Sequence, residues 1–331
     1  MAVIETGSTA PANSGARRSA HADDSSNAIV MRFGGDCLLS EHYERACGED
    51  VSLAFHNFDL FRTADIGMVN LECPVTTRGT KVEKPFNFRM HGRFLDVIKE
   101  AGIDIVNLAN NHIYDYGKVG LFDTITHLDS VGILHVGAGR NKKEAHRPVV
   151  IDERGKRIAF LGYYGGGEAP RATETKAGVA RRELKLIKAD LSRLKRKDSV
   201  DYVVVNLHWG IEKATHPDQE QIKFARTLID SGADAVIGHH PHVLQGIERY
   251  KHGVIAYSLG NLIFGGNSRS SYDTGIFEIR LGSDSTEYDL IPVRIKDWNA
   301  SVLTGAAADS VVQNVRDLSR GFPKSIFKEK K

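Results

Sequence analysis

Carboxylate, amide and imidazole side chains recur at the points where short apolar runs of the sequence end. In chain order these points are Gly35-Asp36, Asn70-Leu71-Glu72, Asn110-Asn111-His112, His208-Trp209-Gly210-Ile211-Glu212 and Gly238-His239-His240-Pro241-His242. Two carboxylates, an amide oxygen and several imidazoles suit Mn²⁺, Fe or Zn²⁺, and they include too many nitrogens for a pure Mg²⁺ or Ca²⁺ site. The sequence therefore predicts one or two bound divalent metal ions.

Two of these residues are assigned more specific roles. A carboxylate shared by two cations can hold them about 3.5–4 Å apart around a common water. Glu72 is the natural candidate for this bridge, because it falls between Asp36 and the later histidines. His112 follows the expected ligand Asn111 by one residue, so we expect it to face a leaving group as a general acid instead of binding metal.

Ordinary structural roles compete with these interpretations. A strand-end histidine such as His208 is more often a satisfied structural residue than a ligand. Asp36 can cap a helix, and Asn110-Asn111 can form a turn. The metal hypothesis depends on such residues occurring at five successive strand ends, which independent caps and turns do not readily produce.

Three further polar residues each allow two interpretations. Asp115 either orients an imidazole or belongs to a turn that starts a helix. Glu212 is either a base beside the site or a surface charge. Asn261 either places its amide on a substrate or marks a tight strand exit.

The elements that position these residues are predicted from hydrophobic patterning. Near-continuous apolar runs typical of buried strands cover 29–36, 66–72, 105–112, 132–139, 157–164, 202–210, 235–242 and 254–261. Helical periodicity appears in 94–102, 119–132, 183–197 and 220–232. Strands alternating with helices indicate the α/β class with a mostly parallel sheet, whose carboxyl edge binds ligands. Runs 275–281 and 288–295 have no helix between them and predict antiparallel strands.

Composition and charge narrow the class of protein. The chain has 331 residues, 41% of them hydrophobic, with 44 Lys and Arg against 42 Asp and Glu. This balance argues against nucleic-acid binding through bulk charge. Three cysteines without CxxC spacing fit a reducing compartment. Residues 1–27 lack the apolar stretch of a secretory signal, and no run is long enough to span a membrane, so we expect a disordered leader on a cytoplasmic protein.

Seven ordered sequence blocks resemble the CapA family of poly-γ-glutamate capsule biosynthesis proteins, which is related to calcineurin-like metallophosphoesterases. Between residues 29 and 267 these blocks are RFGGD, NLECPVT, KPFNFR, VNLANNHIYDYG, LHWGIE, GHHPHVLQGIE and IAYSLGNLIF. The resemblance implies a metallophosphoesterase-like four-layer αββα sandwich with mixed sheets over residues 28–300, followed by a C-terminal extension and basic tail at 301–331. It implies the metal ligands Asp36, Glu72, Asn111, His208, His240 and His242, with His112 as the catalytic histidine.

The resemblance also implies two functions. The first is a metal-dependent hydrolase in which a metal-bound water attacks an amide or phosphoester. Its substrate would be anionic, of γ-glutamyl type, and clamped by basic residues of the loop 74–93 such as Lys84 and Arg89. The alternative is a non-catalytic subunit of a polyglutamate synthase or ligase assembly with biosynthetic partner enzymes. Cys37-Leu38 favours this alternative, because the wider superfamily has Asp-x-His where this chain has Asp36-Cys37-Leu38.

Overall fold

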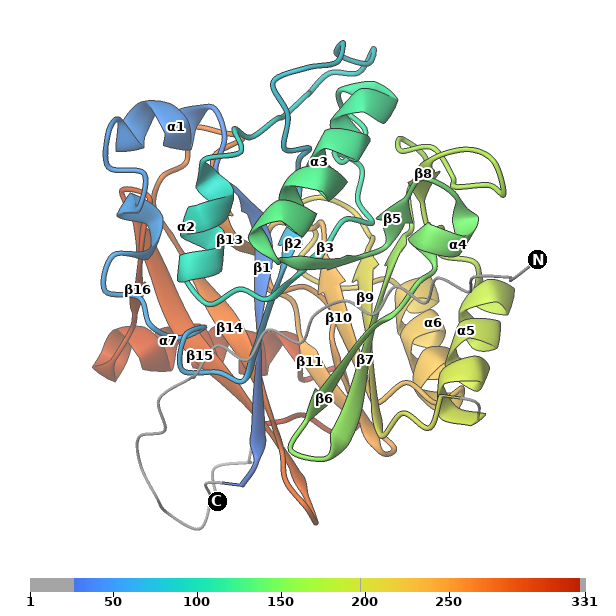
Figure 1. Cartoon of the computed structure of the whole chain (residues 1–331). Helices are drawn as coiled ribbons and strands as arrows, with labels where there is room; N and C mark the ends of the chain where they lie inside the picture. Colours follow the sequence, from blue (N-terminus) through green and yellow to red (C-terminus); the bar gives the residue numbers. More distant parts are fainter. Residues whose placement is uncertain (1–26, 197, 328–331) are drawn as a thin grey trace, which may run out of the picture.

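Two mixed β-sheets lie face to face, and helices cover both outer surfaces (Figure 1). The computed structural model describes residues 27–196 and 198–327 of the chain. The predicted leader therefore lies outside the described residues except for Asn27, and so does the end of the predicted basic tail.

The first sheet carries the N-terminal half of the site. Its order is β16-β15-β14-β1-β2-β3-β4, with β13 also paired to β1. Strands β1 to β4 are parallel, whereas β14 to β16 are antiparallel. The bounds are β1 Ile29–Leu38, β2 Ile66–Leu71, β3 Ile105–Asn107, β4 Leu134–Val136, β13 Asn261–Phe264, β14 Tyr272–Leu281, β15 Thr286–Lys296 and β16 Asn299–Val302.

The second sheet carries the histidine-rich half. Its order is β11-β12-β10-β9-β7-β6, with a parallel centre and an antiparallel strand at each edge. The bounds are β6 Val149–Glu153, β7 Lys156–Tyr164, β9 Tyr202–His208, β10 Ala235–His239, β11 Ile247–Tyr250 and β12 Gly253–Ala256. A short ribbon pairs β5 Ala138–Gly139 with β8 Gly178–Val179.

The alternation of side chains along β1 explains why the sheets stack. Ile29, Met31 and Phe33 point into the layer between the sheets, where the Phe33 ring lies 6.5 Å from that of Phe160 on β7. Cys37 belongs to the separate core beneath the outer helices of the first sheet. Because both faces of the strand are buried, most of its side chains are apolar, and the buried Arg32 is paired with Glu278 of β14 at 2.6 Å.

Helices complete the outer layers. Helices α1 to α3 cover the first sheet, and α5 and α6 cover the second. The bounds are α1 His42–Cys47, α2 Phe94–Glu100, α3 Gly117–Val131, α4 Lys142–Ala145, α5 Leu184–Arg196, α6 Gln219–Asp230 and α7 Gly305–Leu318, with a 3₁₀ turn η1 at Leu53–Phe55. The predicted α/β class and four-layer αββα arrangement with mixed sheets are confirmed.

The predicted helices and strands correspond closely to those observed. All four predicted helices are present as α2, α3, α5 and α6, and the antiparallel pair predicted near the C-terminus is β14 and β15. The domain boundary expected at residue 300 lies within β16, and Val315 of α7 packs into the core between the sheets. Cys37, Cys47 and Cys73 are free and buried. None of the helices in the described part of the chain is long and apolar enough to cross a bilayer.

Candidate metal centre

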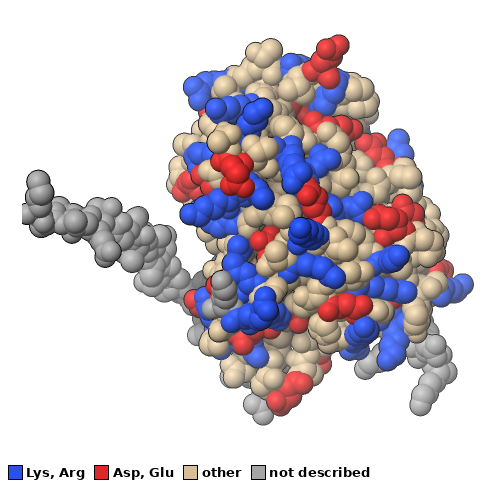
Figure 2. All heavy atoms as spheres, turned by 90° about the vertical axis from the view of Figure 1, so that its right-hand side faces the viewer, with Lys and Arg blue, Asp and Glu red and all other residues tan. Residues whose placement is uncertain are grey.

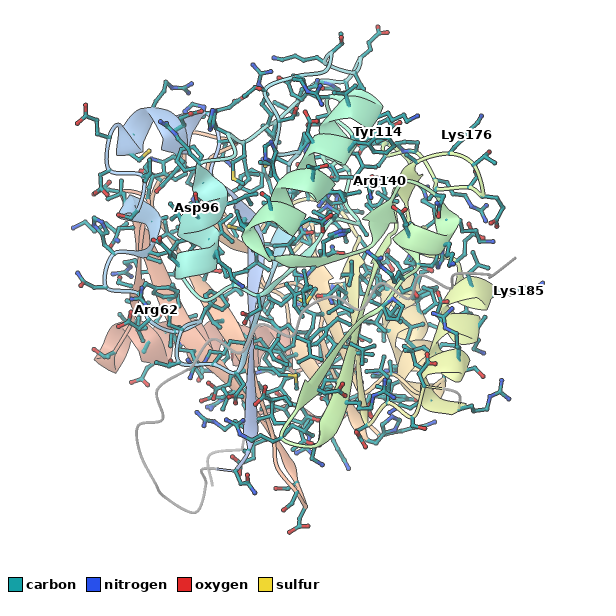
Figure 3. The ribbon with its side chains drawn as sticks, viewed as in Figure 1. Arg62, Asp96, Tyr114, Arg140, Lys176 and Lys185 are labelled. Carbon is teal, nitrogen blue, oxygen red and sulfur yellow. The ribbon has the colours of Figure 1, made fainter. Side chains whose placement is uncertain are left out.

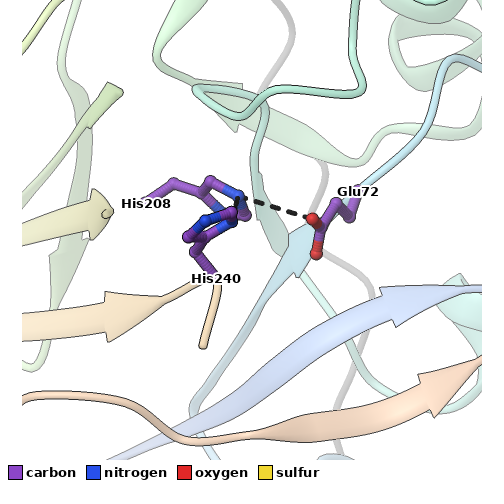
Figure 4. Close-up of side chains that lie close together, drawn as sticks. All are labelled: Glu72, His208 and His240. Carbon is purple, nitrogen blue, oxygen red and sulfur yellow. Dashed lines mark hydrogen bonds and ion pairs between the residues drawn. The ribbon is translucent and has the colours of Figure 1, made fainter. Parts of the chain in front are cut away.

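The six predicted metal ligands gather where the carboxyl ends of strands from both sheets meet. They are Asp36 in β1, Glu72 after β2, Asn111 after β3, His208 at the end of β9, and His240 and His242 after β10. In Figure 4 the Glu72 carboxylate faces the imidazoles of His208 and His240, which come from the opposite sheet. Side chains up to 206 positions apart in the sequence thus share one site.

An irregularity in β1 places Asp36. The register of β1 shifts between Phe33 and Asp36 against β2, and again after Asp36 against β13. Gly35 permits this, because a Cβ there would lie 2.0 Å from the carbonyl oxygen of Gly260. That same oxygen accepts a hydrogen bond of 2.8 Å from the Asp36 N–H. The bulge turns the Asp36 side chain into the site.

Asp36 is a buried carboxylate whose oxygens are well supported. Its Oδ1 accepts a hydrogen bond of 2.8 Å from the Asn70 amide, and its Oδ2 accepts one of 3.2 Å from the His240 N–H. His242 Nδ1 lies 3.1 Å from the same Oδ2. Burial raises the pKa of Asp36, but the hydrogen bond and charge of His242, with smaller help from other histidine groups, outweigh it and hold the pKa below its usual value. Asp36 is therefore anionic.

Glu72 is also buried, but its carboxylate has fewer hydrogen bonds than that of Asp36. Its Oε2 is 3.4 Å from the Asn70 amide, but its Oε1 has no hydrogen-bond partner. Burial and the negative charge of Asp36 raise the pKa of Glu72 well above its usual value. A buried carboxylate oxygen without a donor is costly, and a cation between the two carboxylates would relieve that cost.

Three polar side-chain atoms lie close to the Nε2 ring nitrogen of His208. Its Nε2 lies 2.8 Å from Asn111 Oδ1, 3.1 Å from His240 Nδ1 and 3.4 Å from Glu72 Oε1. One ring nitrogen can hold only one proton, so a proton alone cannot satisfy all three contacts. Burial, reinforced by the neighbouring histidines, lowers the pKa of His208 well below its usual value. The ring is therefore neutral, which is the form that binds a metal.

The histidine loop after β10 has an unusual backbone. His240 has a φ of 101° and His242 a φ of 58°, both in the left-handed region that residues with a Cβ rarely occupy. Such strain persists only where the surroundings enforce it, and it concentrates at functional sites. Here it brings both imidazoles to the same side of the loop as Asp36 and Glu72.

Potential ligand atoms form three overlapping groups, and within each group all lie within 4.8 Å of one another. These groups are Glu72, His208 and His240; Asp36, Glu72 and His242; and Glu212, His240 and His242. Glu72, His240 and His242 each belong to two of them, and of these three only Glu72 has two oxygens with which to bridge a pair of ions. Neither Glu72 Oε1 nor the buried His239 Nδ1 has a hydrogen-bond partner, so water or a cation would satisfy both atoms. The residues present therefore fit a centre for one or two divalent ions.

His112 lies beside these groups with its own partners. Its Nδ1 is 2.7 Å from Asp115 Oδ2, and Lys84 Nζ is 2.5 Å from Asp115 Oδ1 and 3.1 Å from the same His112 nitrogen. Asp115 also accepts a hydrogen bond of 2.6 Å from the Phe88 N–H. A proton on Nδ1 donated to Asp115 leaves Nε2 as the reactive nitrogen of His112. Burial lowers the pKa of His112, and Asp115 partly opposes this effect.

A cavity of about 460 Å³ opens beside the centre. Its lining includes the four predicted site residues His112, Glu212, His242 and Asn261. The Phe88 ring packs 4.4 Å from the His112 ring, and the Phe264 ring lies 4.5 Å from that of His242. One wall is therefore aromatic and holds the two imidazoles in place.

Neither of the two predicted substrate-binding cations is part of the cavity lining. Lys84 is occupied by the Asp115 carboxylate and the Asn111 carbonyl, with its side chain only 13% exposed. Arg89 is exposed outside the cavity lining, with its guanidinium 4.8 Å above the Tyr116 ring. Asn261, predicted as a third substrate contact, lines the cavity, and its Oδ1 is 2.8 Å from His242 Nδ1.

Sequence reasoning assigned no role to several residues that shape the site. Asn70 joins Asp36, Glu72 and His208 through one amide group. Its position in the NLE motif is the signal that could have indicated this role. Lys213 and Arg269 are the basic side chains of the cavity lining. They lie in loops, and no sequence pattern predicts that both line the same cavity.

Known proteins that are similar to this chain show the family to which it belongs. The model of the family described as "Bacterial capsule synthesis protein PGA_cap" matches residues 30–266. This chain belongs to that family. It is 32% identical over 306 residues to "Capsule biosynthesis protein CapA" of Bacillus anthracis, covering 88% of this chain and 74% of that protein. The resemblance to the CapA family inferred from the seven sequence blocks is thus confirmed.

Other relatives carry related names. "PGA biosynthesis protein CapA" of Bacillus subtilis is 29% identical, covering 82% of this chain and 73% of the relative. A "Probable polyglutamine synthesis accessory protein" of Mycobacterium tuberculosis is also 29% identical, covering 78% and 73%. Among solved structures, a putative 5'-nucleotidase from Staphylococcus aureus matches at a TM-score of 0.49 with 14% identity, covering 88% of this chain and 58% of that one.

Proposed function

We propose that this protein is a divalent-metal-dependent hydrolase that acts in capsule polymer biosynthesis on an amide or phosphoester bond. The observation that carries the proposal is the position of Glu72, which is shared by two groups of potential ligands and has a buried oxygen without a donor. Membership of the capsule synthesis family supports the biological setting. His112 at the adjacent cavity supports catalysis.

The ligand set supports Mn²⁺, Fe or Zn²⁺ as the cofactor. One or two ions would be held by Asp36, Glu72, Asn111, His208, His240 and His242. When bound, such a cation polarises a phosphoryl or carbonyl oxygen and lowers the pKa of water. Asn70 would keep Asp36 and Glu72 oriented, because its amide reaches both carboxylates.

His112 is the proposed proton donor to the leaving group. Asp115 holds the Nδ1 proton and orients the ring, so Nε2 would take up a second proton before the leaving group departs and then give that proton to it. Lys84 neutralises Asp115 and fixes that carboxylate on the far side of the ring. Lys84 is therefore better suited to positioning His112 than to the substrate contact predicted from its loop. Glu212, on the cavity wall near His240 and His242, is a candidate for accepting a proton from water.

The cavity supports an anionic substrate. Lys213 and Arg269 line it together with the exposed ring of Phe86. Guanidinium and ammonium groups bind carboxylates and phosphates, and the Phe86 ring offers a surface to methylene groups. A γ-glutamyl chain has both features, so we propose it as the substrate class. Arg89, outside the lining, would contact only a longer chain.

Metal analysis and turnover together test the proposal. The purified protein is stripped with chelator, reloaded separately with Mn²⁺, Fe²⁺ or Zn²⁺, and assayed on a γ-glutamyl amide and on a phosphodiester. We expect one or two ions per chain and metal-dependent hydrolysis of one substrate class. Failure to bind any of these ions would refute the proposal.

A second candidate function is a non-catalytic subunit of a polymer synthase assembly, with biosynthetic enzymes as partners. Leu38 supports it, because this fully buried core side chain occupies the position at which the wider superfamily has a histidine ligand. The relative named an accessory protein supports it as well. Metal binding without hydrolysis by the reloaded protein, combined with co-purification of a synthase, would favour this candidate. The cytoplasmic location stays a prediction that cell fractionation tests.

A further inference from the structure

Positive charge is concentrated in one segment of the chain. Residues 140–198 contain 17 Lys and Arg against eight Asp and Glu, whereas the rest of the chain has 27 against 34. The net charge of the whole chain is therefore close to zero because a positively charged segment is balanced by a negatively charged remainder. Such asymmetry indicates a surface that attracts an anionic partner.

The carboxylates of this segment are already satisfied. Each of the eight contacts a basic side chain or a tyrosine hydroxyl: Glu144, Asp152, Glu153, Glu168, Glu174, Glu183, Asp190 and Asp198. In contrast, six exposed cations have no ion pair with any residue of the described ranges 27–196 and 198–327. We call them the basic face: Lys143, Arg147, Lys176, Lys185, Lys188 and Arg196.

Two residues of the basic face, Lys143 and Arg147, line a hollow between α4 and α5. Lys185, Lys188 and Arg196 lie on α5, the helix that forms one wall of the hollow. The hollow has a volume of about 470 Å³, and both helices contribute to its lining. Its floor contains the mostly buried Asp190, which His146 Nδ1 and the Tyr163 hydroxyl each approach to 2.9 Å. The other two carboxylates of the lining, Glu174 and Asp198, are each paired with a cation of the same lining, Lys142 and Arg193. Figure 2 shows this side of the molecule, with Lys and Arg over much of the surface, and Figure 3 labels Lys176 and Lys185 on it.

The basic face continues toward the metal centre. Arg181, just before α5, lies 5.2 Å above the Tyr164 ring, and that ring is 5.9 Å from the ring of His208. From Lys185 to Arg196 the helix advances about 16 Å. Both rings are buried, so these contacts show that the start of α5 packs close to the centre. A long anionic chain that lies along α5 would touch several cations in turn.

The chemistry of the face favours a polycarboxylate over other polyanions. The exposed large apolar side chains of the described residues are Phe86, Val119, Leu134, Ile211 and Val302, and none belongs to residues 140–196. Single-stranded nucleic acid is normally held by aromatic stacking, and membrane surfaces by inserted apolar side chains. A flexible chain of carboxylates needs neither.

We propose that the basic face binds a linear polycarboxylate, the capsule polymer itself, at a site separate from the metal centre. The identity of the polymer rests on the proposed function, whereas the anion site rests on the charges and the hollow alone. The face would hold the chain while one of its bonds lies in the metal-containing cavity.

Binding of labelled poly-γ-glutamate tests this proposal. Fluorescence anisotropy compares the wild type with K185Q/K188Q/R196Q, and with the control K223Q/K296Q/K324Q, which removes the same charge from exposed lysines outside the segment. We expect the first variant to bind about tenfold more weakly and the control within about twofold, with binding that weakens as salt rises. Hydrolysis of a short substrate should be unchanged in both variants.

Each other outcome is decisive. Equal affinity of the two variants would overturn the proposal. Tighter binding of the wild type to an RNA oligonucleotide, or to vesicles containing anionic lipid, than to poly-γ-glutamate of equal charge would replace the polycarboxylate by that partner. Polymer binding that depends on the basic face in a protein that binds no metal would refute the proposed function and leave this inference standing.

Discussion

Replacement of Glu72 by Gln separates a metal ligand from an ordinary buried acid. In the absence of metal, Glu72 is buried and its Oε1 lacks a donor. An unsatisfied buried polar group costs about 1–3 kcal/mol, and the neutral amide avoids burying a charge next to Asp36. We therefore expect E72Q to raise the free energy of unfolding in chelator by about 1–3 kcal/mol. Most substitutions of buried residues have the opposite sign.

Metal should offset the advantage of the variant. A ligand present at 100 times its Kd stabilises the folded state by about 2.7 kcal/mol. Loss of a carboxylate shared by two ligand groups should weaken metal binding by about 100-fold, the upper value known for groups that merely support ligands. At the same metal concentration, the stabilisation of E72Q by bound metal is then only about 0.4 kcal/mol. Denaturant unfolding of both proteins, with chelator and with metal, measures the two gains.

Glu248 provides the matched control. It is also fully buried, but it accepts hydrogen bonds from Arg226 at 2.6 Å and from the Tyr257 hydroxyl at 2.9 Å. E248Q should lose about 1.5–3 kcal/mol with and without metal, because a charged hydrogen bond is broken in both conditions. An E72Q protein that is less stable than the wild type in chelator, or that gains as much from metal, would show that the reasoning on Glu72 is wrong.

Three more outcomes follow from the site. H112N should lower kcat by about 10²–10⁴-fold and leave the metal content by elemental analysis unchanged, so a drop in bound metal would make His112 a ligand instead. K84M should lower the free energy of unfolding by about 3–5 kcal/mol, since it strands the buried carboxylate of Asp115, and unchanged thermal melting would contradict that pairing. R269A should raise KM for anionic substrates more than R89A does and leave KM for neutral ones unchanged, because Arg269 lines the cavity; equal effects on both substrate types would remove Arg269 from substrate binding.

Much of the fold and the positions of the candidate ligands could be predicted from the sequence. Strands buried on both faces must be apolar, so β7, β9 and β10 stand out as short apolar runs. The polar residue that ends such a run lies at the carboxyl edge of a parallel sheet. Local pattern alone therefore predicts that Asp36 and His208 lie at an edge of this kind.

Other features depend on residues far apart in the chain. The sequence predicts Lys84 as a substrate-binding cation of the loop 74–93, yet packing places it against Asp115, where its charge is used within the protein. Nothing in the sequence around Glu72 shows that one of its oxygens lacks a donor, because that depends on which groups of both sheets approach it.

The amino-acid sequence thus determined the element types and which residues end each strand, because burial and periodicity act over a few neighbouring residues. The tertiary structure alone decided which charges are paired and which face the cavity, as Arg269 does and Arg89 does not. The physical reason is that the ionisation and reactivity of a side chain depend on its distance from water and from other charges. Those distances are fixed only when the two sheets and their loops pack together.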